Sequence, residues 1–173
     1  MAIVFPTGTQ GFPGVAHRFF YDEDDQHRSI GIANNWTQVP GLSLNVATQN
    51  TSNRLLIMPS ISWSCNTTSA EVGFAVHANG SALGVGTSGV TGSNVLDRVA
   101  YGIGDTSNAH VGWKMTQWQQ HVLYHPNTTS TVTYTIYIRG RSSATVNTNR
   151  LDSISSAEGF TGHSELLILE LEA

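Results

Sequence analysis

The strict alternation of side chains near the end of the chain constrains the fold more than any other feature of the sequence. Between residues 131 and 139, β-branched or aromatic side chains on one side alternate with mainly polar side chains on the other. A period of two residues predicts a β-strand with one buried face. Residues 165–173 form a second, largely apolar run. We therefore expect the last residues of the chain to be held in a sheet, so that any attachment segment lies elsewhere.

The composition favours strands over helices. Only 12% of the residues are charged and Lys114 is the single lysine, so residues that form good surface helices are scarce. The 17 glycines, together with many serine, threonine and asparagine residues, supply turns. A length of 173 residues is enough for one sizeable core. We therefore expect an all-β fold.

Turn residues divide the chain from residue 36 onward into short segments. Asn79-Gly80 is the strongest hairpin signal, and Pro126-Asn127 predicts a turn. Pro59 indicates a bulge or an edge position in the strand around it. About nine or ten strands without a convincing helix predict an antiparallel sandwich or jelly roll. The expected strands are residues 42–47, 55–63, 72–76, 82–85, 95–103, 111–115, 122–124, 131–139, 144–146 and 165–172.

The first 35 residues differ from the rest of the chain. They are rich in proline and glycine at their start, and an acidic run, Asp22–Asp25, follows their aromatic cluster. We interpret residues 1–35 as a short irregular N-terminal arm that serves as an attachment segment, and residues 36–173 as the sandwich domain. The aromatic residues expected to fix this arm to its attachment site are Phe5, Phe12, Phe19, Phe20 and Tyr21.

Charge, hydropathy and cysteine content exclude several classes of function. The net charge of −4 leaves no basic patch for a nucleic-acid backbone. No apolar window is long enough to span a bilayer, and residues 1–5 are too short for the apolar region of a signal peptide. Cys65 is the single cysteine, so it forms no internal disulfide and is expected to be a small buried residue. We expect synthesis in the cytoplasm, without nucleic-acid binding or membrane insertion.

Three patterns that suggest a metal or cofactor each lack a necessary part. His121 and His125 have the spacing of a zinc-protease helix, but Val122 occupies the position of its glutamate base. Asp22–Asp25 would suit calcium without matching an EF-hand loop, so we favour a solvated acidic turn or a contact with a basic patch on another protein. Gly84–Gly89 matches a dinucleotide-binding fingerprint, but the residues that follow will not open a helix. We therefore expect no catalytic, cofactor or metal site.

Two tryptophans close to His121 are candidates for binding. Trp113 and Trp118 lie among glutamines, and amphipathic rings in such surroundings are typical of protein interfaces and sugar-binding surfaces. The alternative is that both rings fill the sandwich core or the axis of a trimer, because a sandwich must bury its large residues. We favour this buried alternative for the tryptophans and keep Trp113, Trp118 and His121 as the candidate surface or interface site.

Several segments resemble a known family. Residues 53–63, read as NRLLIMPSISW, are followed by FAVHANGSALGVG at residues 74–86. This order resembles trimeric bacteriophage virion domains with a jelly roll like that of tumour necrosis factor and C1q. Residues 125–139, 147–150 and 164–173 are similar to later segments of the same domains, so the resemblance covers residues 36–173.

The resemblance implies a homotrimeric trimerisation domain at residues 36–173 on a virion. We expect a tail-fibre or appendage module that presents loops to a glycan or protein of the host surface, bound to other virion proteins through residues 1–35. A capsid decoration protein is the alternative. A glycan-modifying enzyme ranks far behind, because acidic residues between the N-terminal run and the last strand are few and scattered. No enzyme activity and no cofactor are expected.

Overall fold

The structure, a computed structural model, describes residues 2–4, 16–65, 71–83, 101–103, 116–140, 142–149 and 162–172. Within these ranges the chain forms thirteen β-strands and no helix. Consequently no helix in the described ranges is a candidate for spanning a membrane. The predicted all-β class is confirmed. Three of these strands lie in the first 35 residues, where none was expected.

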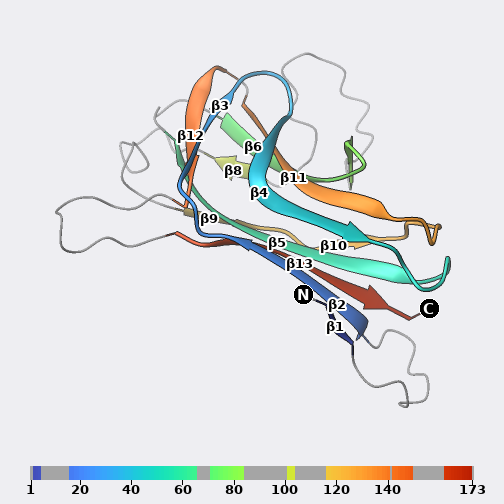
Figure 1. Cartoon of the computed structure of the whole chain (residues 1–173). Coiled ribbons are helices and arrows are strands. Elements are labelled where there is room, and N and C mark those ends of the chain that lie inside the picture. Colours follow the sequence, from blue (N-terminus) through green and yellow to red (C-terminus); the bar gives the residue numbers. More distant parts are fainter. Residues whose placement is uncertain are drawn as a thin grey trace, which may run out of the picture.

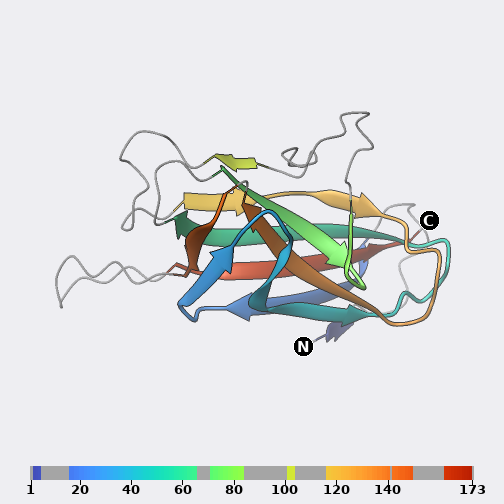
Figure 2. The same ribbon diagram turned by 90° about the horizontal axis from the view of Figure 1, so that it is seen from above.

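The strands form two antiparallel sheets that pack as a sandwich (Figures 1 and 2). The eight-stranded sheet has the order β1-β2-β13-β5-β12-β3, and β9 and β10 also pair with β5. Its strands are β1 (Ala2–Val4), β2 (Ala16–Asp24), β3 (Arg28–Ile32), β5 (Arg54–Cys65), β9 (Thr116–Gln119), β10 (Val122–Tyr124), β12 (Ala144–Thr148) and β13 (Ser164–Leu171).

The five-stranded sheet has the order β4-β11-β6-β7, and β8 also pairs with β6. Its strands are β4 (Thr37–Val46), β6 (Glu71–Ala78), β7 (Ser81–Ala82), β8 (Tyr101–Ile103) and β11 (Val132–Gly140). In Figure 1, β4 and β11 lie over β5 and β13 of the other sheet. This arrangement confirms the predicted antiparallel sandwich and is consistent with a jelly roll.

The core lies between the two sheets, because every second side chain of a strand faces the opposite sheet. The apolar side of β11 is buried, as the alternation of residues 131–139 predicts. On the neighbouring strand of the same sheet, Phe74 of β6 packs against two tryptophan rings of the other sheet, with centroids 5.4 Å from Trp63 and 5.1 Å from Trp118. Cys65 is fully buried, as expected.

The first 35 residues are not an irregular arm where the structure describes them. β2 pairs with β13 from Ala16 to Asp24, and β3 pairs with β12. Phe20 is buried in the core, so the predicted lack of regular structure is wrong for residues 16–32. The alternation of β2 is hard to read from the sequence because Arg18 and Asp24 lie on the same side as Phe20.

Two turn signals and one proline can be compared with the structure directly. Asn79 and Gly80 have φ angles of 48° and 81° and connect β6 to β7, which confirms the predicted hairpin. Asn127 has a φ angle of 52° in the predicted turn before β11. Pro59 lies within β5, which has neighbouring strands on both sides, so it is not at an edge.

The position of Pro59 has a simple cause. The Gln120 N–H donates to the Pro59 carbonyl oxygen at 3.4 Å, and the N and C=O of one strand residue point to the same side. The missing N–H of Pro59 therefore faces the interruption between β9 and β10. β5 thus tolerates a proline because the neighbouring strand is broken at that point.

Candidate functional site

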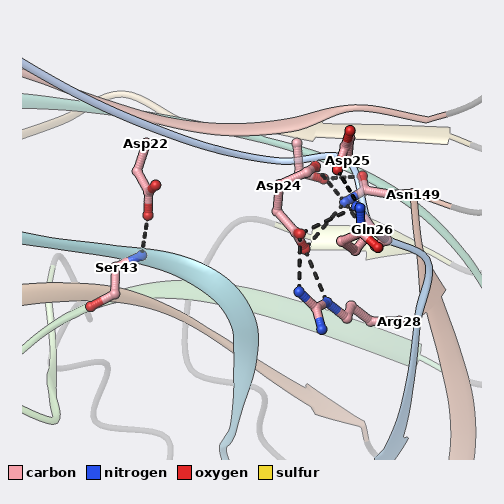
Figure 3. Close-up of polar contacts among 8 residues, drawn as sticks. Asp22, Asp24, Asp25, Gln26, Arg28, Ser43 and Asn149 are labelled. Atoms are coloured by element: carbon pink, nitrogen blue, oxygen red, sulfur yellow. Dashed lines mark hydrogen bonds and ion pairs between the residues drawn. The ribbon is translucent and has the colours of Figure 1, made fainter. Parts of the chain in front are cut away.

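The acidic run lies at the end of β2, so its carboxylates alternate between the interior and the exterior. Asp22 accepts a hydrogen bond from the Ser43 N–H of β4 at 2.8 Å (Figure 3). Asp24 is 6% exposed and accepts from the guanidinium of Arg28 at 3.2 and 3.3 Å. This carboxylate raises the pKa of Arg28 above its usual value through the hydrogen bond and its charge. The predicted solvated acidic turn is therefore wrong for Asp24.

Asn149 connects Asp24 to the centre of the eight-stranded sheet (Figure 3). Its amide donates to the Asp24 carbonyl oxygen at 2.6 Å, and its own oxygen accepts from the Ser164 hydroxyl at 2.6 Å. The Ser62 N–H donates to the same hydroxyl oxygen at 3.0 Å. These groups connect β2, β5 and β13, so Asp24, which lies among them, has a structural role.

β4 is shaped to accommodate the Asp24 carboxylate. The register of β4 with β11 shifts between Thr135 and Tyr137. Gly41 lies within this shift and has a φ angle of 91°. A Cβ atom at Gly41 would come within 2.5 Å of the Asp24 carboxylate. Glycine is thus required here both by the backbone conformation and by the close approach.

The described residues contain no group of three or more histidine, cysteine, aspartate or glutamate side chains that could hold a metal ion. His125 Nε2 lies 2.8 Å from the Thr51 carbonyl oxygen, and His121 is exposed. Gly84–Gly89, with its fingerprint pattern, and expected strand residues 95–100 and 111–115 lie outside the described residues.

A second buried carboxylate was not foreseen. Glu170 of β13 is fully buried and lies 3.1 Å from the Arg18 guanidinium. It also accepts from the Gln49 N–H at 2.6 Å and from the Asn53 amide at 2.8 Å. Arg18 in turn donates to the Ala47 carbonyl oxygen at 2.8 Å. The available signal was the position of Glu170 on the apolar side of a predicted strand, where a charge requires a partner.

The candidate tryptophan site is not at the surface where the structure describes it. Trp118 is only 3% exposed and packs in the core, which confirms the core alternative for this residue. Trp113 lies outside the described residues. Trp118 and His121 therefore do not form a common surface.

The predicted attachment aromatics divide between the two sides of β2. Phe20 lies in the core. Phe19 and Tyr21 are half-buried on the opposite side, with ring centroids 6.2 Å apart. Phe5 and Phe12 lie outside the described residues. A virion-attachment role is available to Phe19 and Tyr21 but not to Phe20, because its ring is enclosed.

An aromatic cluster that the sequence did not indicate lies on the outer side of the five-stranded sheet. The His77 ring stacks on Tyr137 with centroids 3.9 Å apart, and Trp36 meets its edge at 5.4 Å. His77 Nδ1 lies 2.9 Å from the Gly80 carbonyl oxygen, which assigns the proton to Nδ1. Burial lowers the pKa of His77, so the imidazole is neutral at pH 7. The cluster fixes the hairpin between β6 and β7.

The outer side of the eight-stranded sheet carries a set of apolar residues that we call the outer apolar face. In one row, Leu123 of β10 pairs with Leu56 of β5, which pairs with Leu169 of β13. Leu123 is 55% exposed, and the other members are half-buried. The outer apolar face comprises Phe19, Tyr21, Leu56, Met58, Leu123, Leu167, Leu169 and Leu171.

β13 explains why the last strand reads as almost continuously apolar in the sequence. Its inner side contributes Leu166 and Ile168 to the core. Its outer side contributes Leu167, Leu169 and Leu171 to the outer apolar face. A strand with apolar residues on both sides is typical of a sheet that is covered on both faces. This face is the candidate interaction surface.

The chain has been compared with known proteins in three ways. Neither a scan against protein-family models nor a search of curated proteins finds a match. Fourteen chains of solved structures match. Among them is a chain from the structure of infectious bursal disease virus, Gx strain, with a TM-score of 0.44 and 11% sequence identity. The match covers 91% of the present chain and 33% of the viral chain, so the present chain spans about a third of that protein's length.

Proposed function

We propose that the chain is a structural protein of a bacteriophage particle, a homotrimeric tail-fibre or appendage module that presents loops for attachment to the host surface. The virion assignment rests on the resemblance of residues 36–173 to trimeric phage domains. The antiparallel sandwich is the fold which that resemblance implies. The single structural observation that carries an assembly role is the outer apolar face, because a contiguous set of apolar side chains that remain partly exposed marks a protein interaction site.

A binding role without catalysis agrees with the use of the buried charges. Asp24 and Glu170 are held by internal donors, which leaves neither of these carboxylates available to a substrate. His77 is enclosed by aromatic rings, and its Nδ1 is committed to a backbone oxygen. In this role the protein contributes surface and stability to the particle. Three weak sites on one trimer, repeated over many trimers, would supply affinity for the host.

Immunogold electron microscopy of the virus particles tests this proposal, with an antibody raised against the full-length chain. Gold on the tail or its appendages is expected. Gold over the head would replace the tail-fibre proposal with capsid decoration. Binding of the purified protein to host cells separates the same alternatives, because a decoration protein stabilises the head without binding cells. An absence of label on every particle would contradict both.

A further inference from the structure

We propose that the outer apolar face is the surface through which copies of this chain contact one another, with Arg54 of one copy against Glu23 and Glu165 of the next. The inference rests on the homo-oligomer of the proposed function and goes further, because it assigns the contact to particular residues. The apolar residues would supply most of the buried area. The charges at the two ends of the face would set the direction of the contact.

The apolar part of the face spans several strands in register. Leu169 of β13 pairs with Phe19 of β2 as well as with Leu56 of β5. In the neighbouring row Leu167 pairs with both Tyr21 and Met58. The partly buried apolar side chains that pack on the described core are Leu44, Tyr124 and Ala144, and no member of the outer apolar face is among them. Covering these side chains would stabilise an assembly by removing their apolar area from water.

One end of the face is acidic. Glu165 of β13 lies directly opposite Glu23 of β2, and their side chains are 42% and 60% exposed. Like charges at opposite positions of an antiparallel pair repel each other. His163 Nε2 lies 3.9 and 4.0 Å from the two carboxylates, beyond hydrogen-bond distance. Tyr21 donates to Glu23 at 2.7 Å, an interaction that raises the pKa of Tyr21 to about 12. This end is therefore complementary to a cation.

The other end of the face carries that cation. Arg54 is exposed and pairs with Leu171 in the sheet, whereas Glu165 pairs with Ser60. The six residue-to-residue steps from Arg54 to Ser60 span about 20 Å of strand, so Arg54 cannot reach Glu165 of its own copy. The face thus has a basic end, an apolar middle and an acidic end, and it is complementary in charge to a second copy of itself.

A head-to-tail contact satisfies both ends at once. Each copy offers Arg54 to the acidic end of the next copy, and contacts of this kind close into a ring when the rotation permits. The second copy is favoured over an unrelated partner because the chain itself supplies both charges. A ring of three agrees with the proposed homotrimer.

Sedimentation equilibrium of the full-length protein tests the apolar part of the inference. We expect a trimer for the wild type and a shift toward monomer, by at least tenfold in the association constant, for Leu169→Asp. Leu123→Asp is the second variant, because a side chain that is 55% exposed can be replaced without loss of the fold. Gln38→Asp, an exposed position on the other sheet, is the control and leaves the mass unchanged. Circular dichroism confirms that each variant is folded.

A charge exchange tests the direction of the contact. Arg54→Glu and Glu165→Arg each weaken association, and the double variant restores it, because the exchanged charges meet only between copies. If the wild type is a trimer and neither the apolar nor the charge variants change its association constant, the inference is overturned and the homotrimer stands. A double variant weaker than either single variant would likewise overturn the head-to-tail contact. A monomeric wild type would overturn both the inference and the homotrimer, whereas immunogold labelling tests the virion role separately.

Discussion

Glu170 places a carboxylate in the interior, where its charge is stabilised by the Arg18 guanidinium and by two N–H donors. Replacing it with alanine would leave Arg18 without its counter-charge and would remove the acceptor of the Gln49 N–H and the Asn53 amide. We expect Glu170→Ala to lower the free energy of unfolding by about 3 kcal/mol, as is typical when one partner of a buried ion pair is removed. Urea denaturation measures this change. Glu172→Ala, at an exposed position, is the control and should cost less than about 0.5 kcal/mol; equal losses would contradict a special role for Glu170.

Gly41 and Gly80 illustrate two different reasons why a position requires glycine. Both have positive φ angles, of 91° and 81°, but only at Gly41 would a Cβ atom collide with a carboxylate. Gly80→Ala should therefore cost about 1 kcal/mol from backbone strain alone. Gly41→Ala should cost about 1–3 kcal/mol more, because Asp24 must move away from Arg28. Thermal unfolding compares the two variants, and the same cost for both would contradict the close contact between Gly41 and Asp24.

His77 makes stability depend on pH with a definite sign. Burial lowers its pKa in the folded state, whereas the unfolded chain takes up the proton near the usual value of 6.5. Below that pH the unfolded state binds more protons, so the free energy of unfolding falls as the pH decreases, by at most about 1.4 kcal/mol per pH unit for one proton. We expect His77→Gln to flatten this dependence between pH 7 and pH 5, as measured by urea denaturation. An unchanged slope in His77→Gln would contradict the assignment.

Single residues also show where the sequence was not sufficient. Trp118 had a surface and a core interpretation, and Phe20 was expected only to attach the arm; the register of their strands places both in the core. Asp24 and Glu170 lie on inward sides of strands and interrupt the apolar alternation there. Arg28 is only four residues from Asp24, but Asn149 and all the partners of Glu170 are more than 100 residues away, so no local pattern could identify them.

At the scale of elements, β2 is part of the sandwich and not an appendage to it. It adjoins β13 along the whole of that strand, and β3 contributes Ile30 and Ile32 to the core. Strands such as β11 and the hairpin at Asn79-Gly80 were predicted correctly because their period and turn chemistry are local. β2 was not predicted because its inward charged residues interrupt the apolar alternation. The interior position of Pro59 was not predicted because it depends on the interruption between two other strands, β9 and β10.

Truncation tests the place of β2 and β3. A chain that begins at residue 36 lacks both strands and exposes one edge of β13 together with the core residues that they cover. We expect it to be insoluble or to lack a cooperative thermal transition. A chain that begins at residue 16 loses only β1 among the described strands and should unfold cooperatively. A folded, cooperative product from residues 36–173 would contradict the assignment of β2 and β3 to the sandwich.

At the scale of the whole molecule, the fold class was predictable because an antiparallel sandwich repeats one local pattern along most of the chain. The outer apolar face was not predictable from that pattern. It requires the register of β2, β13, β5 and β10, which brings Phe19, Leu169, Leu56 and Leu123 into one row. The proposed assembly therefore depends on tertiary structure, whereas the proposed virion role depends on the sequence resemblance.

Quantitative mass spectrometry of purified virus particles, with isotope-labelled peptides as standards, tests the central claim most directly. The account predicts that the chain is present in every preparation at a copy number per particle that is a multiple of three. A copy number that is not a multiple of three would contradict the homotrimer. Absence of the chain from the particles, despite its abundance in the infected cells, would contradict the role as a structural protein of the virion.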